Sequence, residues 1–390
     1  MKRKIAVIGV GTAGLTSLSH CLSQSDPMWE VVSISDPSIP ILGIGESTTN
    51  AIPANLFYGA RFSLLRDADL LDATVKHGVK YVDWRDHDIF SRIAPPTHGI
   101  HFNNFKLKEF CFIRFKEIWK DKFLEIYGKI EHIDNNDTNV SITIDNEVLK
   151  FDYVIDCRGY PEDYTDYTIS TNIPVNHCLV HTIKEPGNWN YTYHVAHRNG
   201  WMFGIPLKTR QGWGYLYNDN ITSREDAVDD ISDRFKLKKE DLTLREFSFK
   251  NYYANKFIDG RIIKNGNRAL FFEPIEAMSG VFYDYIMNAI TPIIRNQEFN
   301  TDKANNDIIR FAKHLETLNS FIYHGGSTFK SEFWTTTVTN ANLQLSNDAL
   351  FNLYKYRSLD HSPFNGLLWL DLDKGFSYNY FTNSNDSKEW

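Results

Sequence analysis

Three glycines near the N-terminus have the spacing of a dinucleotide-binding turn. They form the pattern G-x-G-x-x-G between a short apolar run and a segment with helical periodicity. The first glycine allows a tight bend, the second lets backbone N–H groups approach a pyrophosphate, and the third lets helix and strand pack closely. The N–H groups at the helix start can then bind phosphate oxygens. The residues expected to hold the phosphates are Gly9, Gly11, Thr12, Ala13 and Gly14.

An acidic residue follows at the distance that suits a ribose. A second apolar run, residues 31–35, ends in Asp36. An acid about 20 residues past the last glycine binds a ribose hydroxyl rather than a 2′-phosphate. The alternative is a glycine-rich turn between strand and helix that binds no ligand.

Two later stretches combine glycines with small polar residues. Gly43, Gly45, Glu46 and Ser47 form a segment whose backbone could lie flat on a ligand, although another plain turn has the same composition. Further on, an apolar run over 267–272 leads through Ser279 and Gly280 into a helical pattern. This offers a second helix N-terminus for an anion or a flavin ring.

Lysine and histidine patterns give weaker signals on their own. Lys80 lies in an alternating run, residues 79–84, that predicts a strand, and the pattern alone favours a solvent-facing lysine. Histidine pairs at 98 and 101, and at 194 and 197, have i, i+3 spacing without a carboxylate in a fixed pattern. We expect no metal site.

Composition limits the classes of partner. The 390 residues are 42% hydrophobic and 23% charged, which is typical of a globular protein. The net charge of −7 and the lack of a long basic run disfavour nucleic acid. The 27 Phe, 20 Tyr and 9 Trp residues either fill the core or line a pocket for a planar ligand.

Cysteine usage and hydropathy indicate a cytoplasmic protein. The four cysteines lie far apart with no C-x-x-C, which favours reduced thiols over disulfides or zinc. No apolar run reaches 18 residues, so we expect no membrane association. The first four residues lead directly into a strand and leave no room for a signal peptide.

The elements that must position these residues follow from periodicity. Helices are expected at 50–72, 104–112, 223–237, 281–290 and 302–319, and a Gly/Ser/aromatic loop at 324–334. Strands are expected at 123–126, 129–134, 140–145 and 148–151 as an antiparallel group, at 153–156 as a return to the parallel sheet, at 200–207 and 212–217 in one sheet, and at 267–272.

Taken in order, these motifs resemble the flavin-dependent halogenases of the tryptophan-halogenase class. The glycine turn is similar to the family's FAD fingerprint, residues 43–48 to its flavin loop, and residues 79–84 to the strand that carries its catalytic lysine. Residues 200–206 are a variant of W-x-W-x-I-P with Phe203 for the second Trp, and Glu273–Glu276 resembles E-P-L-E. Residues 156–159 and 333–334 also fit, and a short viral-type member is suggested.

The resemblance implies a mechanism. Reduced FAD from a separate flavin reductase reacts with O₂, a halide is oxidised to hypohalous acid, and this reaches an active-site lysine. The absence of a second nucleotide fingerprint agrees with a separate reductase. The implied catalytic pair is Lys80, as a hydrogen-bonding ammonium or a haloamine-forming amine of lowered pKa, and Glu276, as a polarising group or proton acceptor. The alternative is an ordinary salt bridge between them.

Departures from the family pattern predict specificity. The implied halide site is Met278, Ser279 and Gly280, and the large, polarisable Met favours bromide or iodide. The chain is shorter than its relatives between residues 84 and 98, which predicts an open pocket and several electron-rich aromatic substrates or phenols. The implied tunnel and substrate residues are Trp201, Phe203, Ile205, Pro206 and Trp334.

The implied fold class is α/β: an FAD-binding Rossmann-like part, an interleaved mixed β-sheet substrate region and a helical C-terminal part. The expected ranges are 1–84, 122–160 and 265–335 for the FAD domain with its hairpins and active-site loop, 85–121 for a helical connection or short substrate lid, 161–264 for the substrate-side sheet, and 336–390 for the C-terminal helical and aromatic segment. A flavin-dependent hydroxylase or epoxidase and a catalytically silent FAD-binding protein remain as alternatives, and a homo-oligomer is left open.

Overall fold

The computed structural model describes residues 2–43, 45–349, 351–352, 366–378 and 380. The chain divides into two compact units, each built from three separate segments. The first unit comprises residues 1–73, 102–169 and 252–312, and the second comprises 74–101, 170–251 and 313–390. Each unit contains its own sheets and its own core.

The first unit is organised around a mainly parallel sheet, as the predicted α/β fold requires. Its strand order is β19-β20-β11-β1-β2-β7, and only the pair β19–β20 is antiparallel. The strands are β1 (Arg3–Ile8), β2 (Trp29–Ser35), β7 (Phe123–Tyr127), β11 (Tyr153–Asp156), β19 (Ile258–Asp259) and β20 (Ile262–Lys264). The parallel strands are rich in buried Ile, Val and Ala, which is typical of a sheet covered on both faces.

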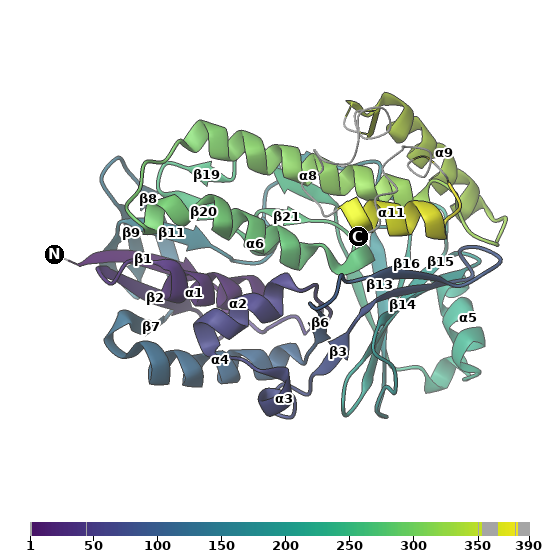
Figure 1. Ribbon diagram of the computed structural model, residues 1–390, viewed down its shortest axis with the longest axis horizontal. Coiled ribbons are helices and arrows are strands. Elements are labelled where there is room, and N and C mark those ends of the chain that lie inside the picture. Colours follow the sequence, from purple (N-terminus) through teal and green to yellow (C-terminus); the bar gives the residue numbers. More distant parts are fainter. Residues whose placement is uncertain (1, 44, 350, 353–365, 379, 381–390) are drawn as a thin grey trace. The chain divides into compact units, whose positions relative to one another are not determined.

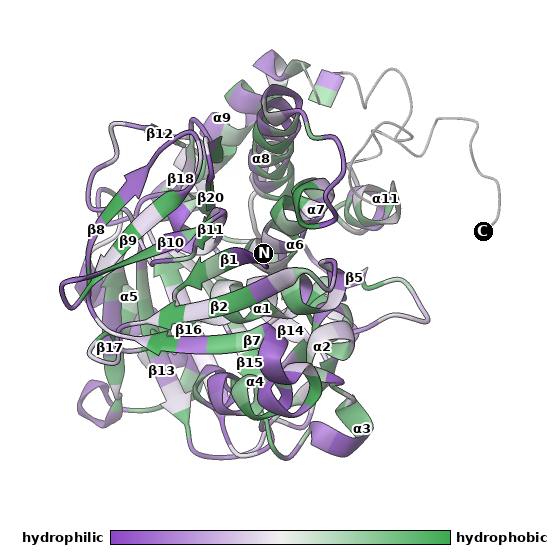
Figure 2. Cartoon of the chain, turned by 90° about the vertical axis from the view of Figure 1, so that its left-hand side faces the viewer, coloured by the Kyte–Doolittle hydropathy of each residue, from purple (hydrophilic) through white to green (hydrophobic). Residues whose placement is uncertain are grey.

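Helices cover one face of this sheet. The central helix α1 (Thr12–Gln24) contacts α2 (Ala51–Ala60), α4 (Asn104–Trp119) and α6 (Ser279–Ala289), which lie around it in Figure 1. In Figure 2, α4 carries hydrophilic and hydrophobic residues side by side, because only part of its surface is buried. Two short helices, α3 (Leu64–Asp67) and α7 (Thr291–Ile294), complete this unit together with the first part of α8 (Thr301–Tyr323).

The other face is covered by a three-stranded antiparallel sheet of β8 (Ile130–Asn135), β9 (Val140–Ile144) and β10 (Glu147–Phe151). Aliphatic residues of β9 pack against residues of β1 and β2 in one hydrophobic cluster. A second small sheet joins β12 (Tyr167–Ile169), β18 (Tyr252–Ala254) and β21 (Leu270–Phe271).

The second unit contains a seven-stranded sheet in the order β17-β13-β16-β15-β14-β4-β5. Its strands are β4 (Gly78–Val82), β5 (Ile89–Arg92), β13 (His177–Ile183), β14 (Thr192–His197), β15 (Gly200–Pro206), β16 (Gln211–Tyr217) and β17 (Leu244–Ser248). A separate two-stranded sheet pairs β3 (Thr74–Lys76) with β6 (Gly99–His101). The predicted pairing of 200–207 with 212–217 is confirmed by the antiparallel β15–β16 ladder.

The two faces of the seven-stranded sheet pack differently. On one face, aromatic and aliphatic residues of β13–β16 pack against α5 (Arg224–Phe235), which lies beside these strands in Figure 1. On the other face, aromatic residues pack with residues of α8 and α9 (Glu332–Asn347) and with Phe376, which directly follows α11 (Gly366–Gly375). None of the described helices combines the length and apolar character needed to cross a membrane.

Four expectations about elements are wrong. The helix predicted at 50–72 breaks after α2, because Arg61 takes a left-handed φ of 52°. Residues 123–126 pair parallel to β2 rather than antiparallel, since the preceding α4 is a crossover helix between parallel strands. The strand predicted at 267–272 shrinks to β21 after a 3₁₀ turn at Gly266–Arg268, where Gly266 has a φ of 64°. Trp334 lies in α9 rather than in a loop, because Ser331 caps this helix by accepting from the Trp334 N–H.

Candidate functional site

The glycine turn of the first unit is open at one of its three glycines. Gly9 has a φ of +96°, and a Cβ there would lie 2.8 Å from the Cys157 carbonyl oxygen. A Cβ on Gly14 would lie 1.9 Å from the Gly9 oxygen, whereas a Cβ on Gly11 would meet nothing within 4 Å. Gly11 also begins α1 without a side-chain cap. The fold itself therefore requires Gly9 and Gly14, while Gly11 leaves the helix N-terminus accessible to a phosphate.

The loop at 43–47 is tied to this turn through a side chain that sequence reasoning missed. Asn104, at the start of α4, accepts a hydrogen bond from the Thr12 hydroxyl at 3.0 Å. Its own N–H donates to the buried Glu46 carboxylate at 3.3 Å. Gly45 has a φ of +81°, and a Cβ there would meet nothing within 4 Å. The loop thus presents a second open glycine. Gly43 is closely packed, because a Cβ there would lie 2.4 Å from Phe105 Cζ, and Ser47 follows in the same loop.

Asp36 stands at the end of β2 as predicted. Its Oδ1 accepts from the Ser38 N–H at 2.8 Å and from the Ser38 hydroxyl at 2.6 Å. These hydrogen bonds lower the pKa of the Asp36 carboxyl below its usual value. Both bonds end on Oδ1, so Oδ2 of an ionised carboxylate can accept a ribose hydroxyl.

A third open glycine lies at the carboxyl end of β11. The buried Asp156 carboxylate binds the Arg158 guanidinium, with Nε at 2.9 Å and Nη2 at 2.8 Å, and the Arg268 Nε lies 3.5 Å away. Gly159 follows, and a Cβ there would meet nothing within 4 Å. In open α/β sheets ligands bind outside the carboxyl ends of the strands. The open glycines therefore fit a dinucleotide at this edge.

The loop before α6 contains strained backbone. Glu276 and Ala277 have left-handed φ values of 57° and 55° in succession, a conformation that costs energy for residues with a Cβ. Glu276 is buried, as is Met278, which precedes α6. Gly280 is needed for packing, since its Cβ would lie 3.0 Å from Ile52 Cγ1 of α2, and Ser279 hydrogen-bonds the Tyr283 hydroxyl.

Lys80 lies on β4 of the second unit in a half-exposed position. Its Nζ is 2.7 Å from Asp88 Oδ2 and lies over the Tyr191 and Tyr193 rings at 5.9 and 6.0 Å. The hydrogen bond to Asp88 raises the pKa of Lys80 above its usual value. The lowered pKa expected for a haloamine-forming Lys80 is therefore wrong: an anionic neighbour stabilises its ammonium form.

The predicted tryptophans lie on the opposite face of the sheet from Lys80. In the ladder, Lys80 pairs with Tyr193 and the next residue, Tyr81, pairs with His194, so these pairs point to opposite faces. Trp201 lies on the Tyr81 face, with its ring 4.7 Å from that of His194. Residues Phe203 and Ile205 share that face by alternation along β15.

A Trp84-centred aromatic cluster closes that face. The Trp84 ring lies 5.4 Å from Tyr81, 6.2 Å from Trp201 and 5.0 Å from Trp334. All four of these side chains are buried. The structure thus brings Trp201 and Trp334 together, and leaves Lys80 across the sheet.

A different lysine belongs to the tryptophan side. Lys76, at the end of β3, has only 1% of its surface exposed, and of the lysines in the described ranges it alone is buried. Burial, together with the Lys76 charge, holds the pKa values of His101 and His194 well below the usual range. Opposite Lys76 in the ladder stands Gly99, which leaves room for the long side chain. Sequence reasoning missed Lys76 because it precedes the alternating run; a lysine flanked by a β-branched residue within a short strand was the available signal.

A chain of hydrogen bonds fixes the tautomer of His101. The Thr74 hydroxyl donates to the Pro206 carbonyl at 2.7 Å, so towards His101 Nδ1, at 3.1 Å, it can only accept. Nδ1 therefore carries the proton, and Nε2 accepts from the Thr192 hydroxyl at 2.9 Å. The predicted motif residue Pro206 thus anchors the strand pair that carries Lys76.

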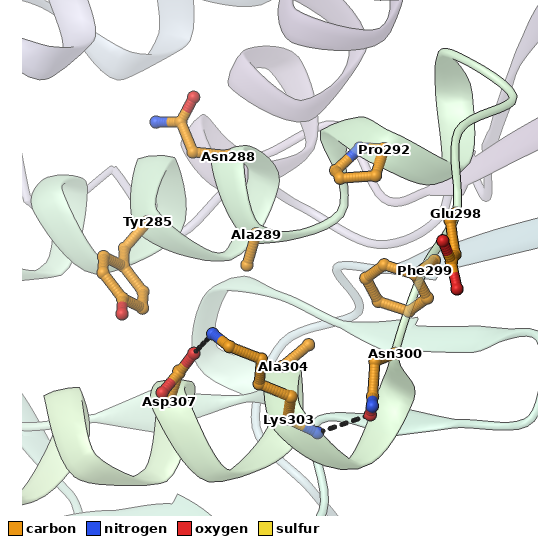
Figure 3. Close-up of a pocket in the computed structure, with 10 residues that line it drawn as sticks. All are labelled: Tyr285, Asn288, Ala289, Pro292, Glu298, Phe299, Asn300, Lys303, Ala304 and Asp307. Carbon is orange, nitrogen blue, oxygen red and sulfur yellow. Dashed lines mark hydrogen bonds and ion pairs between the residues drawn. The ribbon is translucent and has the colours of Figure 1, made fainter.

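A surface pocket of about 530 Å³ lies elsewhere, beside α6, α7 and the start of α8 (Figure 3). Some of its polar residues pair within the pocket: the Lys303 ammonium lies 2.6 Å from Asp307, and the Lys303 N–H donates to Asn300. It contains none of the predicted site residues. No group of three or more His, Cys, Asp or Glu side chains among the described residues is arranged to hold a metal ion.

Comparisons with known proteins agree on one family. The family model described as tryptophan halogenase matches residues 4–126 and 124–371. Tryptophan 7-halogenase RebH of Lentzea aerocolonigenes is 21% identical over 405 residues, covering 81% of this chain and 73% of RebH. Tryptophan 6-halogenase ThaL of Streptomyces albogriseolus is 19% identical, covering 91% and 82%.

Solved structures share the fold. A tryptophan halogenase from Shewanella frigidimarina has a TM-score of 0.82 at 17% identity, covering 96% of this chain and 89% of its own. Xcc4156, a flavin-dependent halogenase from Xanthomonas campestris, has a TM-score of 0.82 at 15% identity with the same coverage.

Proposed function

The chain belongs to the tryptophan halogenase family, and on that premise we propose that it uses FADH₂ and O₂ to halogenate an electron-rich aromatic small molecule through hypohalous acid. The observation that carries this proposal is the buried Lys76 beside the aromatic face that holds Trp201 and Trp334. A buried lysine places a positive charge in an apolar region, and the aromatic surroundings suit a planar substrate.

The first unit supplies a cradle for the cofactor. Gly11 and the start of α1 would bind the pyrophosphate, Asp36 a ribose hydroxyl, and the loop at Gly45 the flavin ring; the open glycines support this placement. When bound, reduced FAD would supply two electrons that reduce O₂ to the peroxide level, and the peroxide would oxidise a halide ion to hypohalous acid with release of water. A separate flavin reductase provides FADH₂, since the sequence has a single G-x-G-x-x-G.

Lys76, rather than Lys80, is our candidate for the lysine that activates hypohalous acid. Lys80 is engaged by Asp88 on the opposite face from Trp201. Lys76 is buried, and its positive charge acts on two histidines with strongly lowered pKa values. A lysine ammonium donates hydrogen bonds, and a bond from Lys76 to the oxygen of hypohalous acid would make the halogen more electrophilic.

Glu276 remains our proposed proton acceptor. Overall, the arene exchanges a ring proton for the halogen of hypohalous acid, and the remaining OH group becomes water by taking up a proton. As the carbon–halogen bond forms and the halogen–oxygen bond breaks, the ring proton passes to a carboxylate. Burial of Glu276 in a strained left-handed turn supports a functional role.

The specificity proposals rest on the loop before α6. Met278, Ser279 and Gly280 are the proposed halide residues, with bromide or iodide preferred because the Met thioether is large and polarisable. Several indoles or phenols, rather than free tryptophan alone, are the proposed substrates, with Trp201, Phe203, Ile205, Pro206 and Trp334 along their path.

The test uses purified protein with FAD, a flavin reductase, NADH, O₂ and a panel of indoles and phenols. Chloride, bromide and iodide are supplied separately, and products are identified by mass spectrometry. Halogenated product that requires both halide and reductase supports the proposal. Hydroxylated product without halide would support a monooxygenase instead, and no product with any halide would support a silent flavin-binding protein.

A further inference from the structure

The last turn of α11 lies against the β4–β5 hairpin. Its final residue, Gly375, packs so closely that a Cβ there would lie 2.4 Å from Ile89 Cγ2 of β5. The next residue, Phe376, is 2% exposed, and its ring centroid lies 5.2 Å from that of Tyr81 and 6.1 Å from that of Trp84. The end of α11 therefore covers one side of the Trp84-centred aromatic cluster.

Two arginines of the hairpin hold α11 in place. Arg92 binds the Asp371 carboxylate, with Nε at 3.1 Å and Nη2 at 2.9 Å. Arg85 donates from Nε to the Phe376 carbonyl at 3.3 Å and from Nη2 to the Tyr378 hydroxyl at 3.1 Å. Arginine stays protonated throughout the physiological pH range, so both guanidinium groups keep their charge there.

A histidine between these arginines has two acceptors as partners. His87 Nδ1 lies 2.8 Å from Asp86 Oδ1, and Nε2 lies 3.0 Å from the Gly375 carbonyl oxygen. The hydrogen bond from His87 lowers the pKa of the Asp86 carboxyl, which keeps it ionised near neutral pH. A carboxylate and a carbonyl can only accept, whereas a neutral imidazole carries a single N–H. Both contacts can therefore be hydrogen bonds only when the His87 ring is doubly protonated.

The surroundings favour this cation. The hydrogen bond to Asp86, followed by the one to Gly375, raises the pKa of His87, and the charge of Arg85 opposes them. Gly375 is the last residue of α11, so its carbonyl lies at the negative end of the helix dipole. The other charged residues that adjoin the pair in sequence are Asp88, which binds Lys80, Lys374, which is exposed, and Asp373, which is buried.

We propose that His87 is a protonation-dependent latch that fastens the end of α11 over the Trp84-centred cluster. In the imidazolium form, the ring joins the hairpin to the last carbonyl of the helix. When the ring releases one proton to water, one nitrogen becomes an acceptor that faces another acceptor. The remaining N–H stays on Nδ1, because a bond to the charged Asp86 is stronger than one to a carbonyl, and the Gly375 contact is lost.

The latch is closed at low pH and opens as pH rises. His87 is exposed, so its ring equilibrates with the protons of the solvent. Its folded-state pKa is raised, so the stabilisation is fully present below about pH 6.5 and is lost as pH rises through the folded pKa. Above that pKa, the end of α11 and Phe376 leave the cluster more often, and aromatic molecules from solvent gain access to it.

Backbone hydrogen exchange measures the latch directly. Deuterium uptake of residues 371–378 is followed by mass spectrometry from about pH 6 to about pH 9, and β1 monitors global unfolding. Rates are corrected for the intrinsic pH dependence of exchange. Losing one hydrogen bond should speed the corrected exchange of residues 371–378 about three- to tenfold across this range. An NMR titration of ¹⁵N-labelled histidines tells whether the midpoint belongs to His87.

Three variants assign the effect. His87→Gln replaces the ring by an amide whose N–H₂ can donate to Gly375 at every pH, so the pH dependence should disappear. Asp86→Asn removes the anionic partner and should move the midpoint to lower pH, because a neutral acceptor stabilises the imidazolium less. His132→Asn changes an exposed histidine of the first unit and, as the control, should behave like wild type.

The outcomes decide the latch in either direction. Corrected exchange of residues 371–378 that does not change with pH in wild type overturns it. An unchanged pH dependence in folded His87→Gln also overturns it, because another group would then control α11. Should His87→Gln not fold, Asp86→Asn decides: a lower midpoint supports the latch, and an unchanged one overturns it. The measurement needs no flavin, halide or substrate, so its result is independent of the proposed halogenation.

Discussion

The two faces of the seven-stranded sheet each carry a group of aromatic rings, and the lysine associated with each group differs in burial. Lys80 belongs to the sheet itself, whereas Lys76 belongs to the separate β3–β6 pair. On the α5-facing side, Lys80 meets Tyr191 and Tyr193, and its charge is balanced by Asp88. On the opposite side, the aromatic cluster around Trp84 is buried, and the neighbouring lysine, Lys76, is 1% exposed. A lysine is thus associated with each group of aromatic rings, but Lys76 is buried and Lys80 is partly exposed to solvent.

The difference between Lys80 and Lys76 concerns the free-energy cost of removing a lysine from water. An exposed lysine that pairs with a carboxylate contributes little beyond a solvated ion pair. A buried lysine loses hydration, so its retention requires compensation by a ligand or a partner. Aromatic content and a lysine in a strand therefore do not locate a site by themselves.

The largest difference between the two faces should appear when each lysine is replaced, one at a time, by methionine. Lys76→Met should reduce halogenated product at least about 10³-fold, which corresponds to about 4 kcal/mol of transition-state stabilisation. Lys80→Met should retain activity within about threefold, because its loss affects only a surface pair. Product is measured by mass spectrometry under saturating halide, with FAD binding as the control for folding. A larger loss of activity in Lys80→Met than in Lys76→Met would place the reaction on the Lys80 face and favour Lys80, the lysine predicted from the sequence, as the catalytic lysine.

The sequence predicted the strand–turn–helix geometry around Gly9–Gly14 better than the burial of the two lysines. The glycine turn, Asp36 and the flavin loop depend on local geometry, which spacing along the chain encodes. The lysine depends on which face of a sheet is covered, and that is settled by α9 and α11, more than 200 residues away in sequence. Periodicity places Lys80 in a strand correctly, but it cannot say which side of that strand is closed. Asn104 was missed for the same reason, because its partners Thr12 and Glu46 come from distant segments.

The second prediction concerns acid stability of the buried histidines. Burial lowers the pKa of His20 and of His197 to about 4. Because the unfolded chain binds these protons from about pH 6.5 downward and the folded chain does not, stability falls as pH drops from 6.5 towards 4. Each such histidine contributes up to about 1.4 kcal/mol per pH unit in this window.

Urea unfolding at about pH 7, 6 and 5 measures this slope. His197→Asn should make it shallower, and the exposed His132→Asn should leave it unchanged. Equal slopes for wild type and His197→Asn would mean that His197 is protonated in the folded state.

The third prediction applies the contrast between open and packed positions to the first unit. Gly11→Val should fold normally, because a Cβ there meets no atom within 4 Å, but it should weaken FAD binding about 30-fold by blocking the pyrophosphate. Gly14→Val should instead destabilise the fold, since its Cβ would lie 1.9 Å from the Gly9 oxygen. Flavin fluorescence titration and thermal melting separate the two effects. Unchanged FAD affinity in Gly11→Val would remove the pyrophosphate from this turn.

The fourth prediction concerns the halide. Met278→Thr replaces a polarisable thioether by a smaller hydroxyl, which should shift the ratio of bromide to chloride product about fivefold towards chloride, or about 1 kcal/mol. Competition between equal concentrations of halides, read by mass spectrometry, gives the ratio directly. Ser23→Thr, near the end of α1 with its hydroxyl bonded to the Ser19 carbonyl of the same helix, is a control that should leave the ratio unchanged. A wild-type enzyme with a clear preference for chloride would contradict the proposed role of Met278.

The smallest effect should be the loss of unfolding free energy when the Lys80–Asp88 ion pair is broken. The Asp88 side chain is 53% exposed, so breaking the pair with Asp88→Asn should cost less than about 1 kcal/mol of unfolding free energy. Because the pKa of Lys80 is raised by Asp88, this contribution is present at neutral pH and is lost only as pH rises through the folded pKa of Lys80. Urea unfolding at low and high salt measures it, since salt screens exposed charges. If Asp88→Asn lowered the unfolding free energy by several kcal/mol, independent of salt, the Lys80–Asp88 pair would behave as an ion pair shielded from solvent. The distinction between an exposed Lys80 and a buried Lys76 would then fail.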